Sequence, residues 1–172
     1  KNYYKVIAVT RNIHQKGLQL KTQANPGYLE LVELKTLDEA KIKDLFNSCS
    51  VCINLIGILY EKNKGQFQKI HSVLPNILSK IAKEKKIDQF IHVSALGVEN
   101  ASNSVYAKSK LDGENNVKKN FKNSLILKPS IVYGIDDNFT TNFMSLLSKL
   151  PIMPLYYNGE TKFVPIHVSD LA

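Results

Sequence analysis

The sequence predicts an α/β fold, a Rossmann-like doubly wound parallel sheet, and three observations favour it. Short apolar runs recur along the chain at 6–9, 28–34, 51–56, 89–95 and 124–128. Helical patterns separate the later runs, at 38–46, 67–84 and 104–120. The run at 51–56 is apolar with little alternation, as in a strand buried on both faces. Strands that alternate with helices of this length form parallel sheets with right-handed crossovers, and these sheets bind ligands at the carboxyl ends of their strands.

Turn and capping residues mark the bounds of several elements. Asn25-Pro26-Gly27 indicates a turn between the first two strands. Asp38 precedes the first helical pattern as a capping residue. Asp136-Asp137 is interpreted as the start signal of a helix at 139–147 rather than as an acid–base pair. The sequence therefore predicts strand and helix positions along most of the chain.

The length of the chain, 172 residues of which 44% are hydrophobic, indicates one domain. We expect a nucleotide-binding domain over 1–172, with the start of a substrate lobe from about 136–172. A short strand pair is expected at 155–157 and 162–165, followed by the opening of a helix at 168–170. No apolar run approaches the ~18–20 residues that cross a bilayer, and the N-terminus lacks the layout of a signal peptide. Because the chain starts without Met and stops within a helix signal, we expect a fragment of a longer protein.

The net charge of +8 permits attraction to nucleic acid, to an anionic membrane surface or to an acidic partner. The lysines are dispersed over helical patterns without interleaved aromatics, which predicts a solvated basic face and no specific nucleic-acid site. Cys49 and Cys52 form a CxxC pair without a second pair or a histidine at ligand spacing, which favours ordinary burial over a metal site. The four histidines are interpreted as structural residues: His14, His71, His92 and His167.

The strongest functional signal is Tyr106-Ala107-Lys108-Ser109-Lys110, with Ser94 twelve positions earlier at the end of a predicted strand. Tyr106 and Lys110 are four residues apart and project from one helix face, where a serine leaving the neighbouring strand can converge on them. A nearby ammonium lowers the pKa of a phenol, and a serine hydroxyl can hold a carbonyl or hydroxyl of a substrate. The pattern predicts catalytic residues of a nucleotide-dependent enzyme, and its alternative is a packed tyrosine beside a solvated lysine.

Arg11 directly follows the first strand and is an isolated guanidinium in a chain whose other cations are lysines. In a Rossmann sheet this position lies beside the adenosine ribose. A guanidinium there suits bidentate contact with a 2′-phosphate, whereas an acid would indicate NAD. The sequence therefore predicts NADP(H) rather than NAD(H), and the alternative is a surface arginine without a ligand.

The chain resembles the atypical or extended short-chain dehydrogenases/reductases, which are NAD-dependent epimerase/dehydratase-like proteins. Within them it is similar to the branch of the NADPH-binding accessory subunit of respiratory complex I. The resemblance to that branch rests on Asn-Leu-Ile-Gly-Ile-Leu-Tyr-Glu at 54–61, on Ser-Ala-Leu-Gly at 94–97 and on Asp-Asp-Asn-Phe at 136–139. Three more segments follow the wider family pattern, at 9–12, 128–134 and 164–170.

The resemblance implies a role for each matching residue. Tyr106 would be the acid–base residue, Lys110 would bind the nicotinamide ribose and the tyrosine, and Ser94 would bind substrate. Arg11 would contact the 2′-phosphate. The remaining cofactor-binding residues would line the adenosine side (Asn54, Gly57 and Ile58) and the nicotinamide carboxamide (Pro129, Ser130 and Ile131).

The chain departs from the family in one place, because the first strand and its Gly-rich phosphate loop are missing. Two functions remain open. In the first, the protein is an active NADP-dependent oxidoreductase or epimerase acting on a small hydroxyl or carbonyl substrate. In the second, it holds the nucleotide structurally, as an accessory factor of a respiratory complex or in quinone metabolism. The resemblance implies a cytoplasmic or organelle-matrix location, peripheral to the inner membrane.

Overall fold

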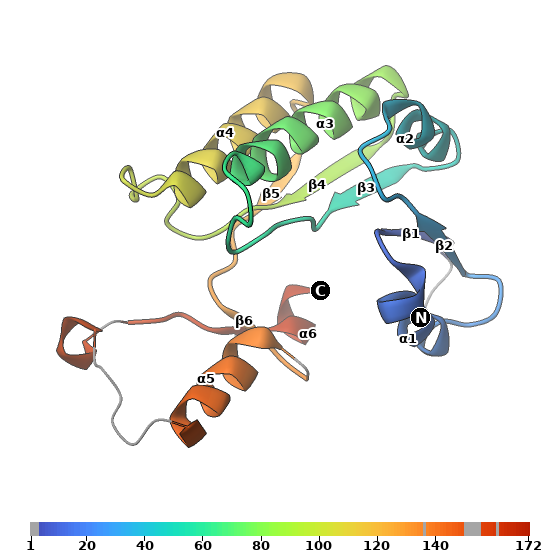
Figure 1. Ribbon diagram of the computed structural model, residues 1–172. Coiled ribbons are helices and arrows are strands. Elements are labelled where there is room, and N and C mark those ends of the chain that lie inside the picture. The colour runs from blue at the N-terminus through green and yellow to red at the C-terminus, as the bar shows by residue number, and fades with distance from the viewer. Residues whose placement is uncertain (1–3, 136, 150–155, 161) are drawn as a thin grey trace. The chain divides into compact units, whose positions relative to one another are not determined.

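The computed structural model divides the chain into two compact units, residues 1–48 and 49–172 (Figure 1). It describes residues 4–135, 137–149, 156–160 and 162–172. The fold is Rossmann-like α/β, with every described strand pair parallel, as predicted. The described strands form three sheets, β1-β2, β3-β4-β5 and β6-β7. Within the described part, no helix is both long and apolar enough to span a bilayer.

The first unit contains the two predicted N-terminal strands and a crossover between them. Strands β1 (Val6–Thr10) and β2 (Leu29–Glu33) pair in parallel. The polar stretch between them forms π-helix η1 (Ile13–Gly17) and helix α1 (Leu18–Gln23), which the sequence analysis did not predict. Parallel strands need such a crossover, because a tight turn cannot join them. Helix α2 (Glu39–Phe46) starts as predicted, since the Asp38 side chain accepts hydrogen bonds from the amides of residues 40 and 41.

The second unit is built on the sheet β3-β4-β5 with two helical crossovers. The strands are β3 (Val51–Asn54), β4 (Gln89–Val93) and β5 (Leu125–Leu127). The crossovers are π-helix η2 (Gln68–Val73) continuing into α3 (Leu74–Glu84), and helix α4 (Val105–Asn120). All these elements were predicted within a few residues. Strand β3 ends two residues early because the Asn54 side chain accepts a hydrogen bond from the Ile56 amide and turns the backbone.

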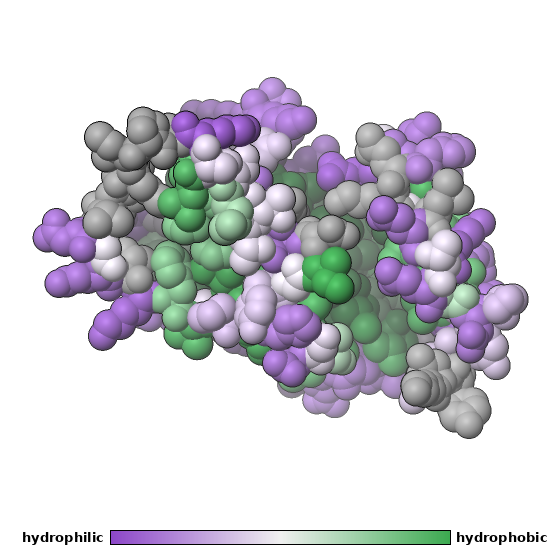
Figure 2. Space-filling view, turned by 90° about the horizontal axis from the view of Figure 1, so that it is seen from below, coloured by the Kyte–Doolittle hydropathy of each residue, from purple (hydrophilic) through white to green (hydrophobic). Residues whose placement is uncertain are grey.

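Helices α3 and α4 lie side by side against this sheet (Figure 1). Because side chains alternate along a strand, Phe90, His92 and Ser94 share one face, and all three are buried. Phe90 contacts Phe121 at the end of α4, which shows that this face meets the helices. The other face carries apolar side chains that reach the surface, namely Val51, Ile53 and Leu125. Figure 2 shows apolar surface, in green, between hydrophilic residues, in purple, on the side of the molecule that it presents.

Small and polar residues of α4 allow close contact with η2 and α3. Ser109, Gly113, Asn116 and Asn120 recur at three- and four-residue spacing and so lie on one helix face. Asn116 donates to Ser72 at 3.1 Å, and Asn120 donates to Ser79 at 3.0 Å and to the Asn76 side chain at 2.9 Å. A Cβ atom on Gly113 would lie only 1.9 Å from the carbonyl oxygen of His71. At Gly113 the backbone of α4 therefore lies directly against the backbone of η2.

The sequence explains why the His71 carbonyl is available for that close contact. Pro75, four residues later, has no N–H and cannot donate the α-helical hydrogen bond to it. The Leu74 amide bonds five residues back, to Lys69, so the turn is π-helical. The carbonyl thus faces α4, where a residue without a side chain is needed.

The C-terminal part of the second unit contains a two-stranded parallel sheet, β6 (Val132–Tyr133) and β7 (Ile166–His167), which the sequence analysis did not predict. The predicted helix at 139–147 is confirmed as α5 (Asn138–Lys149), and Asp137 bonds the amide and hydroxyl of Thr140 at its start. Helix α6 (Val168–Leu171) matches the predicted helix opening.

The predicted strand pair at 155–157 and 162–165 is wrong in the residues that the structure describes. A 3-10 helix, η3 (Tyr156–Gly159), stands there, and residues 162–165 form no strand. Turn formation around Asn158 and Gly159, both at positive φ, overrides the strand pattern of the aromatic residues. Asp136, from the predicted helix start, and Leu155, from the predicted strand pair, lie outside the described residues.

Candidate functional site

The loop after β3 is held by the side chain of Asn54, which is buried. Its amide nitrogen lies 3.1 Å from His92 Nδ1, and its oxygen accepts from the Ile56 amide at 3.2 Å. Since Asn54 donates to His92 Nδ1, the proton of neutral His92 sits on Nε2, a buried atom without a hydrogen-bond partner. Asn54 therefore shapes the loop backbone at the carboxyl end of the strand, where a ligand is expected.

The His71 side chain, from η2, holds the same loop. The Ile58 amide donates to His71 Nε2 at 3.0 Å, and His71 Nδ1 lies 3.0 Å from Ser109 Oγ. Ser109 in turn donates to the carbonyl of Tyr106 at 2.7 Å. This chain of hydrogen bonds connects the loop after β3 to the helix that carries the Tyr-x-x-x-Lys pattern. This role of His71 could not be predicted from the sequence, because a histidine inside a helical pattern gives no signal of what its ring contacts.

Lys110 lies buried at the same edge of the sheet, with 6% of its surface exposed. Its ammonium donates to the Val93 carbonyl at 3.2 Å, at the end of β4. It lies 3.4 Å from the point where Gly57 would carry a Cβ atom. Burial lowers the pKa of Lys110, and the nearby Glu114 carboxylate opposes this shift. The structure thus brings Gly57 and Lys110 together, two residues that the sequence singled out separately.

The ring of Tyr106 packs against two other aromatic rings. Its ring meets His71 and Phe67 edge to face, with ring centroids 5.2 and 5.5 Å away. Burial raises the pKa of Tyr106, the opposite of the lowering expected from a neighbouring lysine. The Lys110 ammonium donates instead to the Val93 carbonyl, and it is not among the causes of the Tyr106 shift. The two residues share a helix face, where the Tyr106 ring contacts aromatic rings and the Lys110 ammonium contacts a carbonyl.

Ser94 is directed into the helix layer. Its hydroxyl donates to Glu114 at 2.6 Å, and Glu114 is fully buried. The Glu114 carboxylate also pairs with Lys128 at 3.0 Å and, at 3.8 Å, with Lys118. Glu114 and Lys128 had no role among the residues predicted from the sequence. A glutamate one helical turn after Lys110 was the available signal, because it faces the same side of α4.

The turn at 129–131 closes this edge of the sheet. The Leu96 amide donates to the Pro129 carbonyl at 2.9 Å, which joins the loops after β4 and β5. The Ile166 amide donates to the Ile131 carbonyl at 2.9 Å, next to the sheet β6-β7. Pro129, Ser130 and Ile131 are all half-buried. These residues therefore follow β5 at the same edge as Gly57 and Lys110.

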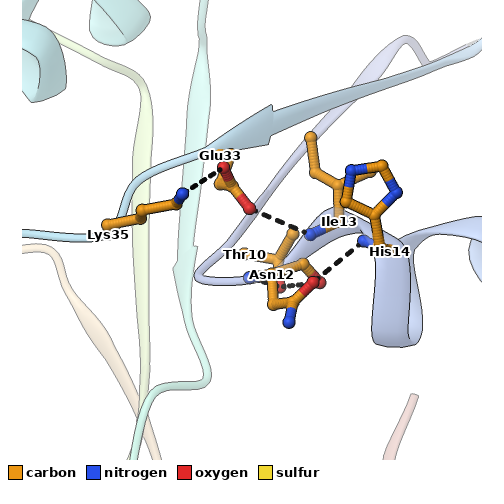
Figure 3. A network of polar contacts seen from close by, with 6 residues as sticks. All are labelled: Thr10, Asn12, Ile13, His14, Glu33 and Lys35. Carbon is orange, nitrogen blue, oxygen red and sulfur yellow. Dashed lines mark hydrogen bonds and ion pairs between the residues drawn. The ribbon is translucent and has the colours of Figure 1, made fainter.

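Arg11 lies in the first unit and is exposed, directly after β1. The structure brings an acid close to this strand end, because Glu33 is the register partner of Thr10. Figure 3 shows how that carboxylate is bound: one oxygen accepts from the Ile13 amide at 3.3 Å, and the other pairs with Lys35 at 3.5 Å. The loop backbone next to Arg11 is further fixed by Asn12, whose side chain accepts from the His14 amide. The acid therefore has partners other than the guanidinium.

No group of three or more potential metal ligands occurs among the described side chains. Cys49 and Cys52 are not disulfide-bonded, and both are half-buried. Burial, together with Cys49, raises the pKa of the Cys52 thiol to about 12, which makes that thiol a poor ligand and a poor nucleophile.

The two buried histidines predict acid sensitivity. Burial, reinforced by the Lys110 charge, lowers the pKa of His71 and of His92 from 6.5 to about 4, while Glu61 and Glu114 oppose it. Between pH 6.5 and about 4, these two rings bind protons in the unfolded chain but stay neutral in the folded chain. The free energy of unfolding therefore falls as the pH drops from about 6.5 to about 4, by about 1.4 kcal/mol for each unit of pKa difference.

Urea unfolding at pH 7.5, 6.0 and 5.0 measures this effect, and the midpoint is expected to fall steadily. A His14→Gln variant, altered at an exposed ring in the first unit, should show the same pH dependence as the wild type. A midpoint that stays constant from pH 7.5 to 5.0 would contradict the assignment.

Comparison with known proteins agrees with the fold and with the predicted resemblance, although no protein-family model matches the chain. The mitochondrial NADH dehydrogenase (ubiquinone) 1 alpha subcomplex subunit 9 of Mus musculus is 28% identical over 155 residues, covering 90% of this chain and 41% of that protein. Its Arabidopsis thaliana counterpart is 29% identical over 168 residues, covering 97% and 42%. The chain thus spans about two fifths of the length of these curated relatives.

Solved structures share the fold at low sequence identity. A dTDP-glucose 4,6-dehydratase from Streptomyces venezuelae, with NAD bound, superposes with a TM-score of 0.75 at 16% identity, covering 99% of this chain and 61% of that one. A dTDP-4-dehydrorhamnose reductase from Bacillus anthracis, in complex with NADP, gives a TM-score of 0.65 at 16% identity, covering 87% and 62%. The chain therefore has the Rossmann-like fold of the epimerase, dehydratase and reductase proteins, and the two sequence relatives described above are subunits of mitochondrial NADH dehydrogenase.

Proposed function

We propose that this chain is the nucleotide-holding part of an NADP(H)-binding, short-chain dehydrogenase/reductase-like accessory subunit of a respiratory NADH dehydrogenase. The Mus musculus and Arabidopsis thaliana relatives are named as mitochondrial subunits of that complex, which supports a location on the matrix side of the inner membrane. The chain spans 41–42% of the length of these relatives, so the role of the whole protein is part of what we propose.

The observation that carries the proposal is the pairing of Gly57 with the buried Lys110 ammonium at the carboxyl ends of β3 and β4. This edge is where parallel α/β sheets bind dinucleotides. A residue without a side chain lets a ribose approach the backbone closely, and an ammonium can donate to ribose hydroxyls. The residues present therefore fit a nicotinamide dinucleotide.

In this arrangement the residues bind and orient the cofactor. Lys110 would donate to the nicotinamide ribose, and Pro129, Ser130 and Ile131 would approach the carboxamide. Asn54, Gly57 and Ile58 would line the adenosine side through their backbone. The bound nicotinamide itself supplies the capacity for hydride transfer.

Arg11 supports NADP(H) over NAD(H). Its guanidinium is exposed at the end of β1, and a planar fork of donors matches a phosphate. The nearby Glu33 carboxylate is bound by the Ile13 amide and by Lys35. Because the Glu33 carboxylate already has these partners, it is less available to bind the ribose hydroxyls of the adenosine. The local charge therefore favours a 2′-phosphate.

The side-chain contacts favour an accessory role over catalysis. Ser94 gives its hydroxyl hydrogen to a buried carboxylate, and the pKa of Tyr106 is raised rather than lowered. An enzyme that uses this serine would need its hydroxyl to leave the Glu114 carboxylate. The second candidate, an active NADP-dependent oxidoreductase or epimerase using Ser94, Tyr106 and Lys110, is favoured by the presence of all three residue types in the expected order.

A basic surface is available for docking on a partner. Exposed lysines gather at the ends of α3 and α4, around a depression of about 400 Å³ that includes Lys83, Lys119 and Lys122 in its lining. Such a surface attracts an acidic partner and weakens as salt is added. This charge supports association with a larger complex.

A Tyr106→Phe variant distinguishes the two roles. Loss of the phenol oxygen leaves the ring contacts with His71 and Phe67 in place, so we expect wild-type stability and wild-type incorporation into the respiratory complex. The measurement is complementation of cells that lack the full-length protein, followed by assembly and NADH:ubiquinone activity of the complex. A matched Tyr133→Phe change serves as the control. Failure of Tyr106→Phe alone, with normal folding, would support the enzyme instead.

A further inference from the structure

We propose that Ser109, acting through His71, is a positioning residue that holds the loop at 56–58 in the conformation that meets the dinucleotide. The inference deepens the proposed function and rests on it. Neither residue needs to touch the cofactor. The chain of contacts runs from the Ile58 amide through the imidazole and the Ser109 hydroxyl to the Tyr106 carbonyl.

The direction of every hydrogen bond in this chain is determined. The Ile58 N–H can only donate, so His71 Nε2 must accept and carries no proton. In a neutral imidazole the proton is then on Nδ1, which donates to Ser109 Oγ. Ser109 uses its own proton to bond the Tyr106 carbonyl, so its oxygen is an acceptor toward His71. Ser109 therefore selects the one tautomer that can hold the Ile58 amide.

The surroundings of His71 keep the ring neutral and fixed. The charged and titratable groups that act on it are Lys110 from α4, His92 from β4 and Glu61 from the loop before η2. Burial and the Lys110 ammonium disfavour the imidazolium, while Glu61 opposes them. Phe67 stacks on the ring and Tyr106 meets it edge to face, at centroid distances of 5.4 and 5.2 Å. With charge and orientation set, the remaining freedom is the tautomer.

Removing the Ser109 hydroxyl is expected to reverse that tautomer. Nδ1–H would lose its acceptor in a buried site, and the form protonated on Nε2 would become competitive. That form points an N–H at the Ile58 N–H, so two donors face each other and the loop loses its anchor. Gly57, the preceding residue, lies against Lys110, so the displacement occurs where the nucleotide is expected.

The test uses the full-length protein with Ser109→Ala, the conservative Ser109→Thr and the control Ser72→Ala. Ser72 is a buried serine on η2, and its partner is Asn116 rather than His71. The readouts are the ¹⁵N pattern of the His71 ring, hydrogen exchange of the Ile58 amide, and the Kd for NADPH. Ser109→Ala is expected to shift the ring proton to Nε2, speed exchange at Ile58 and weaken NADPH binding about tenfold, the effect of one lost hydrogen bond. Ser109→Thr should restore all three.

An unchanged ring tautomer and unchanged Ile58 exchange in Ser109→Ala would overturn the proposal. The same losses in Ser72→Ala would also overturn it, because they would indicate general loosening of the helix contact. The ring and exchange readouts are made without nucleotide. A wild-type protein that binds no NADPH would therefore contradict the proposed function, while these two readouts still decide the role of Ser109.

Discussion

A Gly113→Ala variant is expected to be less stable than the wild type by about 1–3 kcal/mol or more, the usual effect of overpacking. In an exposed helix the same change would stabilise the protein by about 1 kcal/mol, because glycine is the poorer helix former. Here the added methyl group would lie 1.9 Å from the His71 carbonyl oxygen. That oxygen belongs to the backbone of η2, so relief requires α4 to move away from η2 and α3.

Urea unfolding followed by circular dichroism measures this effect. Asn115→Ala is the matched control, since this neighbouring residue of α4 is exposed and its replacement should leave stability unchanged or slightly higher. Because the carbonyl belongs to His71, the Gly113→Ala variant should also show faster exchange of the Ile58 amide. Gly113→Ala with wild-type stability would mean that the two helices do not meet as closely as the structure has them.

An Arg11→Ala variant is expected to lose about ten- to a hundredfold in affinity for NADPH and little for NADH. The estimate corresponds to about 1.5–3 kcal/mol for hydrogen bonds to a charged group. Arg11 is exposed, so folding should be unaffected. Nicotinamide fluorescence titrations of both nucleotides against the full-length protein provide the measurement.

Competition makes the Arg11 test specific to the 2′-phosphate. Adenosine 2′,5′-bisphosphate should displace NADPH from the wild type far better than AMP does, and this preference should vanish in Arg11→Ala. Lys21→Ala, an exposed cation on α1, controls for the change in net charge. Equal losses for NADPH and NADH would show that Arg11 does not read the 2′-phosphate.

The elements of the fold that the sequence predicted are those with strong local signals. Strands β3 and β4 are dense apolar runs, and Asp38 caps α2 as expected. The crossover η1–α1 was missed because its residues are largely polar and include Gly17, a poor helix former. The two-residue strands β6 and β7 were missed because pairing between distant segments, rather than local pattern, defines them.

The candidate site shows a similar division. Spacing alone predicts that Tyr106 and Lys110 share a helix face. It does not predict that the Lys110 ammonium donates to the Val93 carbonyl, or that the Ser94 hydroxyl donates to Glu114. Those partners depend on how α4 packs against β4. His71 was interpreted as structural, yet its ring bonds the loop that should meet the nucleotide. Side-chain direction inside a packed layer is a tertiary property.

Hydrogen exchange of the full-length protein with and without NADPH tests the central claim most directly, namely that the loops at the carboxyl ends of β3, β4 and β5 hold the dinucleotide. We predict saturable binding that slows exchange at residues 55–58, 94–97 and 130–131. The opposite edge of the sheet, at residues 47–50, 85–88 and 121–124, should not change. No binding, or protection confined to that opposite edge, would contradict the account.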